Sequence, residues 1–238
     1  MNGLTNSVFP TGEVKTHEFQ VTFERRFAKG FNLNLGYTRV WNRVADFYLN
    51  EFDSAPKLRE SNSIRPHRLV ATGIYELPFG KGRAFAQRGL GNYIFGGFQI
   101  AVTYERQPGP LLNFGNLFYY GAIGDITSGT RTLERWFNTA NFERSASRGP
   151  ASFHRRVFPD RISGLRSDMT NQLNANVQRE FKWRERISFQ VRFDAINLQN
   201  RSQFDAPNLN PFSTDFGRIT QQSAALNRLL QIHGRIRF

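Results

Sequence analysis

The residues of this chain that could do chemistry are four histidines, His17, His67, His154 and His233, and scattered acidic and serine side chains. A histidine binds a metal ion or moves a proton when a second ligand or an orienting carboxylate lies at a suitable spacing. Neither an HExxH motif nor any other paired-ligand spacing joins two of these histidines. We therefore expect no metal site and no catalytic residues.

Nucleotide-binding and serine-hydrolase motifs are incomplete. Gly89 and Gly91 begin a GxG pair, but Ile94 occupies the position at which the dinucleotide fingerprint needs a third glycine. The glycines of residues 80–82 lack the spacing of a phosphate-binding loop and are typical of a turn. No serine lies in a GxSxG elbow. The sequence thus predicts a protein that is not an enzyme and that holds no cofactor.

The end of the chain shows a different regularity. Residues 230–238 alternate between apolar and polar side chains and end on Phe238. Because successive side chains in a strand point to opposite faces, this stretch is predicted to be a strand with one apolar and one polar side. It is about as long as a tilted strand must be to cross a bilayer. The polar side carries Gln231, His233, Arg235 and Arg237.

Six further stretches alternate with the same period of two. The clearest ends at Ala195, and the weakest contains Val70 and Ile74, which fall on its polar side. Glu105 and Asp194 lie on the polar sides of their strands, where we expect ion pairing rather than acid–base catalysis. The six stretches are residues 18–24, 31–38, 69–77, 98–105, 173–178 and 187–195.

The connections between these strands alternate between short and long. Residues 27–30 and 182–185 have hairpin length. Residues 42–66, 107–170 and 198–227 are long loops rich in Asn, Ser, Pro, Arg and Gly, which we expect to be structureless. Transmembrane barrels have short periplasmic turns and long extracellular loops. The sequence therefore predicts an all-β fold, an antiparallel transmembrane β-barrel segment of about seven strands that is open because closed bacterial barrels have even strand numbers.

Aromatic residues are expected to form belts at the two ends of the strands, where rings sit at the level of the lipid headgroups. Such belts would place the apolar sides of the strands against hydrocarbon. The expected inner belt consists of Phe27, Phe31, Phe79, Phe95, Phe181, Trp183 and Phe238, and the outer belt of Tyr37, Trp41 and Tyr104.

The composition limits other classes. The absence of cysteine excludes disulfides and thiolate metal sites, and no apolar run approaches the roughly 18 residues of a transmembrane helix. Residues 1–10 contain no basic segment, apolar core or cleavage site of a secretory signal peptide. Since an outer-membrane protein needs such a signal, we expect residues 1–238 to be the C-terminal piece of a longer protein.

The net charge of +13 suggests anionic partners. Of 32 basic residues five are lysines, which leaves 27 arginines. A nucleic-acid interface could be drawn through residues 25–27 or 153–158, but the arginines are dispersed and no RRM, KH or zinc-finger motif is present. We favour two other roles for the arginines over nucleic-acid binding. Arginines of the loops would face lipopolysaccharide. Lumen-facing arginines, such as Arg192, Arg235 and Arg237, would pair with acidic residues of a plug and of strands outside this chain.

Seven short motifs resemble the C-terminal third of Oar-like TonB-dependent outer-membrane receptors, over about residues 13–238. The resemblance implies a barrel of about 22 strands, closed by an N-terminal plug that this chain lacks, in the outer membrane. It also implies import of a nutrient or oligomeric substrate, energy coupling by TonB through parts absent here, and recognition of Phe238 by the barrel assembly machinery. The motifs are LPFGKGR (77–83), GGFQI (96–100), QPGPL (107–111), WFNTANF (136–142), FDAIN (193–197), FDAPN (204–208) and FGRI (216–219).

Two alternatives from other classes remain open on the sequence. The first is a secreted or surface β-sandwich that binds carbohydrate, and the second is a basic nucleic-acid-binding protein. A sandwich buries its apolar face against another sheet and has turns every 8–12 residues. The long stretch 107–170 does not fit that spacing.

Overall fold

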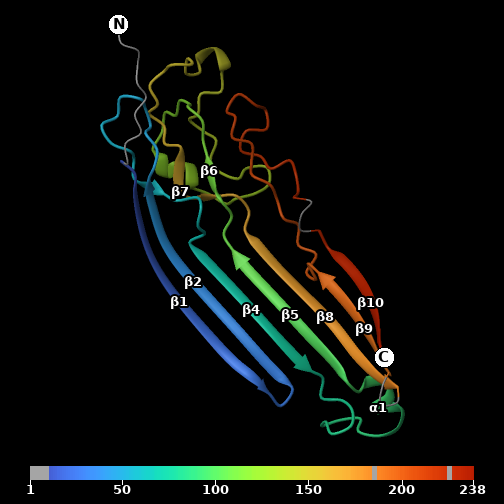
Figure 1. Ribbon diagram of the computed structural model, residues 1–238. Helices are drawn as coiled ribbons and strands as arrows, with labels where there is room; N and C mark the ends of the chain where they lie inside the picture. Colours follow the sequence, from blue (N-terminus) through green and yellow to red (C-terminus); the bar gives the residue numbers. More distant parts are fainter. Residues whose placement is uncertain (1–10, 184–186, 224–226) are drawn as a thin grey trace.

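A computed structural model describes residues 11–183, 187–223 and 227–238, without the side chain of Trp183 (Figure 1). Residues 1–10, and residues 184 and 185 of the expected turn at 182–185, lie outside these ranges. No helix in the described ranges is long and apolar enough to cross a membrane. The main sheet follows the order β1 (Glu13–Ala28), β2 (Phe31–Ala45), β4 (His67–Glu76), β5 (Phe98–Gln107), β8 (Thr170–Trp183), β9 (Ile187–Ile196) and β10 (Leu229–Arg237).

All seven predicted strands are therefore confirmed, and each lies antiparallel to its neighbour in the chain. The register keeps like side chains in rows across the sheet, as the alternation requires. We call the two sides the apolar face and the polar face. One row of the apolar face runs Phe23, Leu35, Ala71, Tyr104 and Leu173, and the next row, on the polar face, runs Thr22, Gly36, Val70, Glu105 and Gln172.

The turns at the lower end of the sheet are tight or locally packed. Lys29 and Gly30 have φ angles of 53° and 79°, the left-handed pair that a two-residue hairpin turn needs between β1 and β2. The connection from β4 to β5 contains α1 (Gly89–Phe95). There the ring centroid of Phe79 lies 6.0 Å from that of Phe85 and 6.3 Å from that of Phe95. The predicted inner aromatic positions Phe79 and Phe95 thus lie together beyond the strand ends.

The long loops are not structureless, so that expectation was wrong. They form what we call the cap, residues 46–66, 108–169 and 197–223, which lies above the upper ends of the strands in Figure 1. It contains β3 (Arg59–Glu60), β6 (Leu111–Asn113), β7 (Arg161–Arg166) and the 3-10 turns Ile123–Thr127 and Ala146–Arg148. Its buried core consists of Leu112, Phe114, Leu117, Ile126, Phe137, Phe142, Phe158, Ile162, Leu165 and Phe216.

Polar contacts join the three loops of the cap to one another. Arg59 from the first loop pairs with Asp160 from the second and, at 2.8 Å, with Asp46. The hydrogen bond from Arg59 holds the pKa of Asp46 below its usual range. Between the second and third loops, the backbone N–H of Trp136 donates to the carbonyl of Gly217 at 2.8 Å. The loops therefore fold as one unit.

The edges of the main sheet are open, because β1 and β10 each pair on one side only within the described chain. Every residue of both strands is exposed. Unpaired edge strands and a broad apolar face promote association in water. Without detergent the chain is therefore expected to elute as broad, polydisperse species in size-exclusion chromatography with light scattering. A sharp monomer peak with cooperative thermal unfolding would contradict this description of its surface.

Candidate functional site

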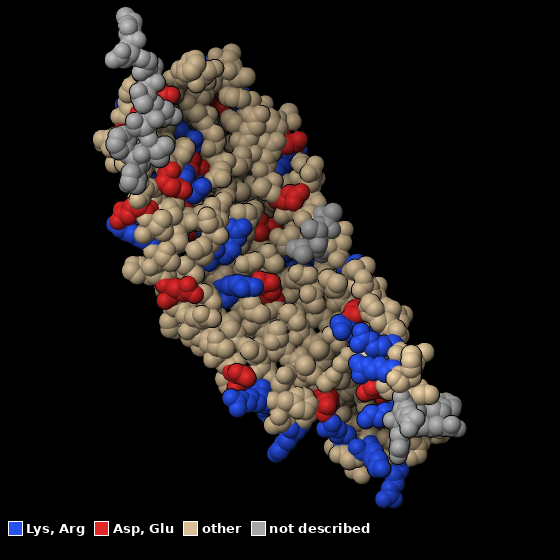
Figure 2. Space-filling model, viewed as in Figure 1, with Lys and Arg blue, Asp and Glu red and all other residues tan. Residues whose placement is uncertain are grey.

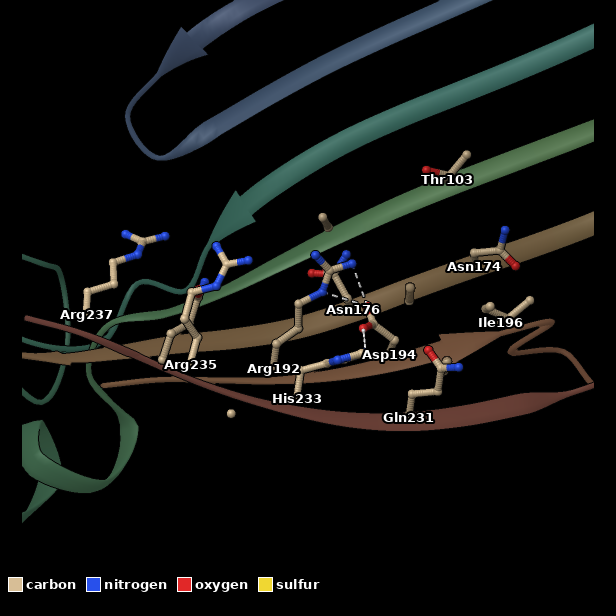
Figure 3. Close-up of a pocket in the computed structure, with 15 residues that line it drawn as sticks. Thr103, Asn174, Asn176, Arg192, Asp194, Ile196, Gln231, His233, Arg235 and Arg237 are labelled. Carbon is tan, nitrogen blue, oxygen red and sulfur yellow. Dashed lines mark hydrogen bonds and ion pairs between the residues drawn. The ribbon is translucent and has the colours of Figure 1, made fainter. Parts of the chain in front are cut away.

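A hollow of about 710 Å³ lies on the polar face and spans four neighbouring strands, β5, β8, β9 and β10 (Figure 3). A hollow that crosses this many strands means that the polar face is concave here. The alternation that makes these strands amphipathic sends every second side chain into it. Thr103 comes from β5, Asn174 and Asn176 from β8, and most of the charged groups from β9 and β10.

Asp194 is the centre of the charged part of the hollow. Its Oδ1 accepts hydrogen bonds of 2.7 Å from Arg192, two residues earlier on β9. Its Oδ2 lies 3.2 Å from Nε2 of His233, which reaches across from β10 (Figure 3). Only 14% of the Asp194 side chain is exposed, so the carboxylate is held by partners on both sides. The Asp194 carboxylate is therefore held in place by Arg192 and His233.

Positive charge nevertheless exceeds negative charge in the hollow, whose lining contains three arginines and one acidic residue. Arg237 lies 3.8 Å from Glu180 on β8, while Arg235 forms no ion pair with any side chain that the structure describes. Figure 2 shows, on one face of the molecule, that basic side chains gather toward the end of the sheet that bears α1 and the C-terminus. The hollow therefore offers guanidinium donors to an anionic group.

Amide side chains continue this polar surface across the sheet. The side-chain amide of Gln190 donates to Oε1 of Gln178 at 3.1 Å, and Gln178 donates to Gln99 on β5. Further along, the side chain of Asn174 accepts the backbone N–H of Asn197 at 2.9 Å. Such a row presents fixed donors and acceptors that suit the hydroxyl and amide groups of sugars and peptides.

A comparison with protein families identifies the kind of domain to which this sheet belongs. Residues 2–231 match the outer membrane beta barrel domain. The chain belongs to this family. Comparison with curated proteins finds no match. The barrel domain is therefore located in the outer membrane, where its polar face lines the lumen and its apolar face contacts lipid. The β-sandwich alternative is wrong, because the described residues form one large sheet and one two-stranded sheet inside the cap.

The histidines of the barrel domain contact different parts of the fold. No cluster of three or more metal-ligating side chains occurs among the described residues. His67 lies 2.7 Å from the hydroxyl of Tyr37 on the apolar face, and His154 packs against Phe118 in the cap. Asp194 and Glu105 both form ion pairs, the latter with Arg68 at 2.9 Å, which confirms the role expected for these carboxylates.

The lumen-facing arginines were predicted on the correct face but with incomplete partners. Arg192, Arg235 and Arg237 do line the same hollow of the barrel domain. Within the sheet itself, Arg192 pairs with Asp194 and Arg237 with Glu180, which the prediction did not include. Strand register decides these pairs, and the sequence pattern alone does not show which residues stand opposite one another.

The sequence interpretation missed arginines on the lipid-contacting face of the barrel domain. Arg39 lies 4.8 Å from the ring centroid of Trp41, and Arg179 lies 4.4 Å from that of Phe181. These cation–π pairs sit near opposite ends of the strands, at the expected aromatic belts. The sequence alternation could have placed arginines on this face. Arg39 on β2, and likewise Arg106 on β5, fall in phase with the apolar residues of their strands, near the long loops.

Proposed function

We propose that this outer membrane barrel domain is the C-terminal portion of a TonB-dependent receptor of the Oar-like type, which binds a nutrient or oligomeric substrate and imports it. The ordered motifs and the two open sheet edges support this proposal, because open edges suit a sheet that continues into further strands. TonB would act through a plug and coupling segment outside residues 1–238. The barrel assembly machinery would recognise the terminal strand with Phe238.

The observation that carries the proposal is the lumen hollow with its excess of arginine and its row of amides. Such a surface suits reversible contacts with a polar or anionic substrate or with acidic groups of a plug. The dispersal of the arginines over both faces and the cap argues against nucleic acid as a partner. We likewise propose that the domain binds and conducts without catalysing a reaction.

The proposed orientation places the cap outside the cell and the Lys29–Gly30 turn in the periplasm. Barrels of this class have long extracellular loops and short periplasmic turns, and the three cap loops all leave the same end of the sheet. In this orientation the cap meets lipopolysaccharide at the cell surface. The lumen hollow then extends along the strands from Ile196, at the cap end of β9, to Arg237, at the periplasmic end of β10.

The test of transport follows nutrients without assuming their identity. Cells that produce the protein are compared with cells that lack it, and compounds removed from a mixed peptide and glycan medium are measured by mass spectrometry. We expect at least one compound to be removed only by producing cells, and this removal to stop when the proton-motive force is collapsed or TonB is deleted. Identical depletion by all these cells would contradict the proposal.

The hollow itself is tested by replacing Arg235 and Arg237 together with glutamine. Removal of charge-assisted hydrogen bonds is expected to slow depletion of that compound by roughly ten-fold. The matched control is Arg88→Gln, an exposed arginine in the connection from β4 to β5. Unchanged uptake by the double variant, at equal amounts in the outer membrane, would exclude the hollow from substrate recognition.

A further inference from the structure

A second cavity, of about 490 Å³, lies on the other side of the sheet from the lumen hollow. It is bounded by the upper ends of β2, β4 and β5 and by the cap. Tyr37, Leu69 and Arg106 stand in one cross-strand row of the apolar face, which places the mouth of this groove on the face that contacts lipid. We call it the rim groove.

The floor and walls of the rim groove are largely apolar. Leu69 and Met169 offer aliphatic surface, and Trp136 forms a wall from the cap. The indole N–H of Trp136 donates to the backbone carbonyl of Arg166 at 2.7 Å, so its ring is held in place. A groove with this lining accommodates a hydrocarbon chain.

Two charged groups that line the groove, one arginine and one aspartate, are buried and already paired. Arg166 is buried and pairs with Glu60, while it also donates to the carbonyl of Gly109 at 3.0 Å. Asp168 is buried and is held by Arg201 at 2.7 Å and by the backbone N–H of Phe204 at 3.1 Å. Neither group is left to bind a ligand.

Two other arginines of the groove are exposed and have no acidic partner among the described side chains, Arg106 on β5 and Arg131 on the cap. Arg131 donates one hydrogen bond to the carbonyl of Gly164 at 3.0 Å and lies 6.0 Å from the ring centroid of Trp136. These contacts position the Arg131 guanidinium over the groove, and its other N–H groups remain able to donate hydrogen bonds. Uncompensated guanidinium groups from two different elements thus border an apolar groove at the end of the lipid-facing surface.

We propose that the rim groove binds a phosphorylated glycolipid of the outer leaflet, the lipid A portion of lipopolysaccharide. Arg106 and Arg131 bind a phosphate group, and an acyl chain lies over Leu69 and Met169. Guanidinium groups match phosphate oxygens in pairs, and basic pockets beside membrane-spanning elements bind lipid headgroups. The inference uses the cap-outside orientation proposed above and does not depend on transport.

The orientation decides between two kinds of phosphorylated lipid. If the cap lies outside the cell, the lipid beside the groove is lipopolysaccharide, whereas the opposite orientation would bring phospholipid to the same arginines. The membrane-facing mouth makes a soluble anion a poor occupant, because a free phosphate would leave the apolar floor uncovered. Binding measurements can distinguish lipopolysaccharide from phospholipid, and a lipid from a free phosphate.

The experiment measures lipid binding by native mass spectrometry of the protein extracted in detergent from the outer membranes of cells that produce it. The probes are diphosphoryl lipid A, fully dephosphorylated lipid A, phosphatidylglycerol and inorganic phosphate. We expect retained diphosphoryl lipid A, with affinity at least roughly ten-fold above that of the dephosphorylated form, because charge-assisted contacts to phosphate are lost. Inorganic phosphate at millimolar concentration should not displace it.

The variants separate the two arginines from general surface charge. Arg106→Gln combined with Arg131→Gln is expected to weaken binding of diphosphoryl lipid A by at least roughly ten-fold. Arg155→Gln, which neutralises an exposed cap arginine that does not line the groove, should retain wild-type affinity. Circular dichroism verifies that each variant keeps the β-sheet signal of the wild type, and the comparison of lipids by the wild type needs no variant.

Four results would overturn the proposal. Equal affinity for the phosphorylated and dephosphorylated forms would remove phosphate from recognition. Wild-type affinity in the double variant, or equal losses in the double variant and in Arg155→Gln, would remove the two arginines. Tighter binding of phosphatidylglycerol through the same arginines would replace the glycolipid with a phospholipid. Failure of the nutrient-depletion test leaves each of these results unaffected, so the two proposals fail separately.

Discussion

Replacement of Phe142 by alanine is expected to destabilise the cap by about 3–5 kcal/mol, the usual cost of removing a buried phenylalanine side chain. Phe142 is 6% exposed, and its ring packs against four other aromatic rings of the cap. Its ring centroid lies 4.6 Å from Tyr119, 5.0 Å from Phe216, 5.8 Å from Phe158 and 6.3 Å from Phe137. The substitution therefore leaves a cavity between residues of two loops.

The effect should be confined to the cap, because the main sheet is held by its own strand pairing. Hydrogen exchange of the detergent-extracted protein is expected to show lost protection in β6 and β7 and unchanged protection in β4 and β5. The matched control is Phe153→Ala, since Phe153 lies on the same loop but is fully exposed. Equal loss of protection in the two variants, or protection of the cap unchanged by Phe142→Ala, would contradict a cooperatively packed cap.

Arginine at Val102 is expected to destabilise the barrel by about 2–4 kcal/mol if that side chain meets the middle of the bilayer. Val102 is in the middle of β5, on the apolar face, opposite Gly73 of β4 and Ala175 of β8. Thr103 is its neighbour in the chain but lies in the lumen hollow. Thr103→Arg should therefore change stability little, because the lumen is hydrated.

The pair is measured by urea unfolding of the protein in phospholipid vesicles, with each variant compared with the wild type. Burial in a soluble core would also penalise Val102→Arg, so a second measurement locates the lipid. A fluorophore on cysteine introduced at position 102 should be quenched by lipid-chain quenchers and not by aqueous iodide, and the reverse should hold at position 103. Similar quenching at both positions would contradict the assignment of the two faces.

The sheet could be predicted from sequence because its signal is local. Stretches such as 187–195 alternate without interruption, and alternation alone states which side chains share a face. Val70 and Ile74 weakened the prediction for β4, yet they do lie on the polar face, where the neighbouring strands decide their environment. The strands extend beyond the predicted stretches, as at the start of β1, because residues there break the alternation while the pairing with β2 continues.

The cap could not be predicted in the same way, because its core joins residues that are distant in sequence. Phe137 and Phe216 have ring centroids 5.3 Å apart, yet they belong to different loops and follow no period. The ion pair between Asp194 and His233 likewise depends on the register of β9 with β10. A density of Gly, Pro, Asn and Arg indicates a loop, but it does not indicate whether that loop packs against another.

If the cap lies outside the cell, as proposed, a core that is shared between its loops limits how this part of the cell surface can change. Surface loops ordinarily tolerate independent variation, because each is held only at its ends. Here a change at Phe216 in one loop alters the packing of Phe137 and Phe142 in another, so the loops must vary together. Escape from antibodies or phage is then expected at exposed positions such as Phe52 and Phe153, and an antibody raised against an isolated loop peptide should bind the native protein poorly.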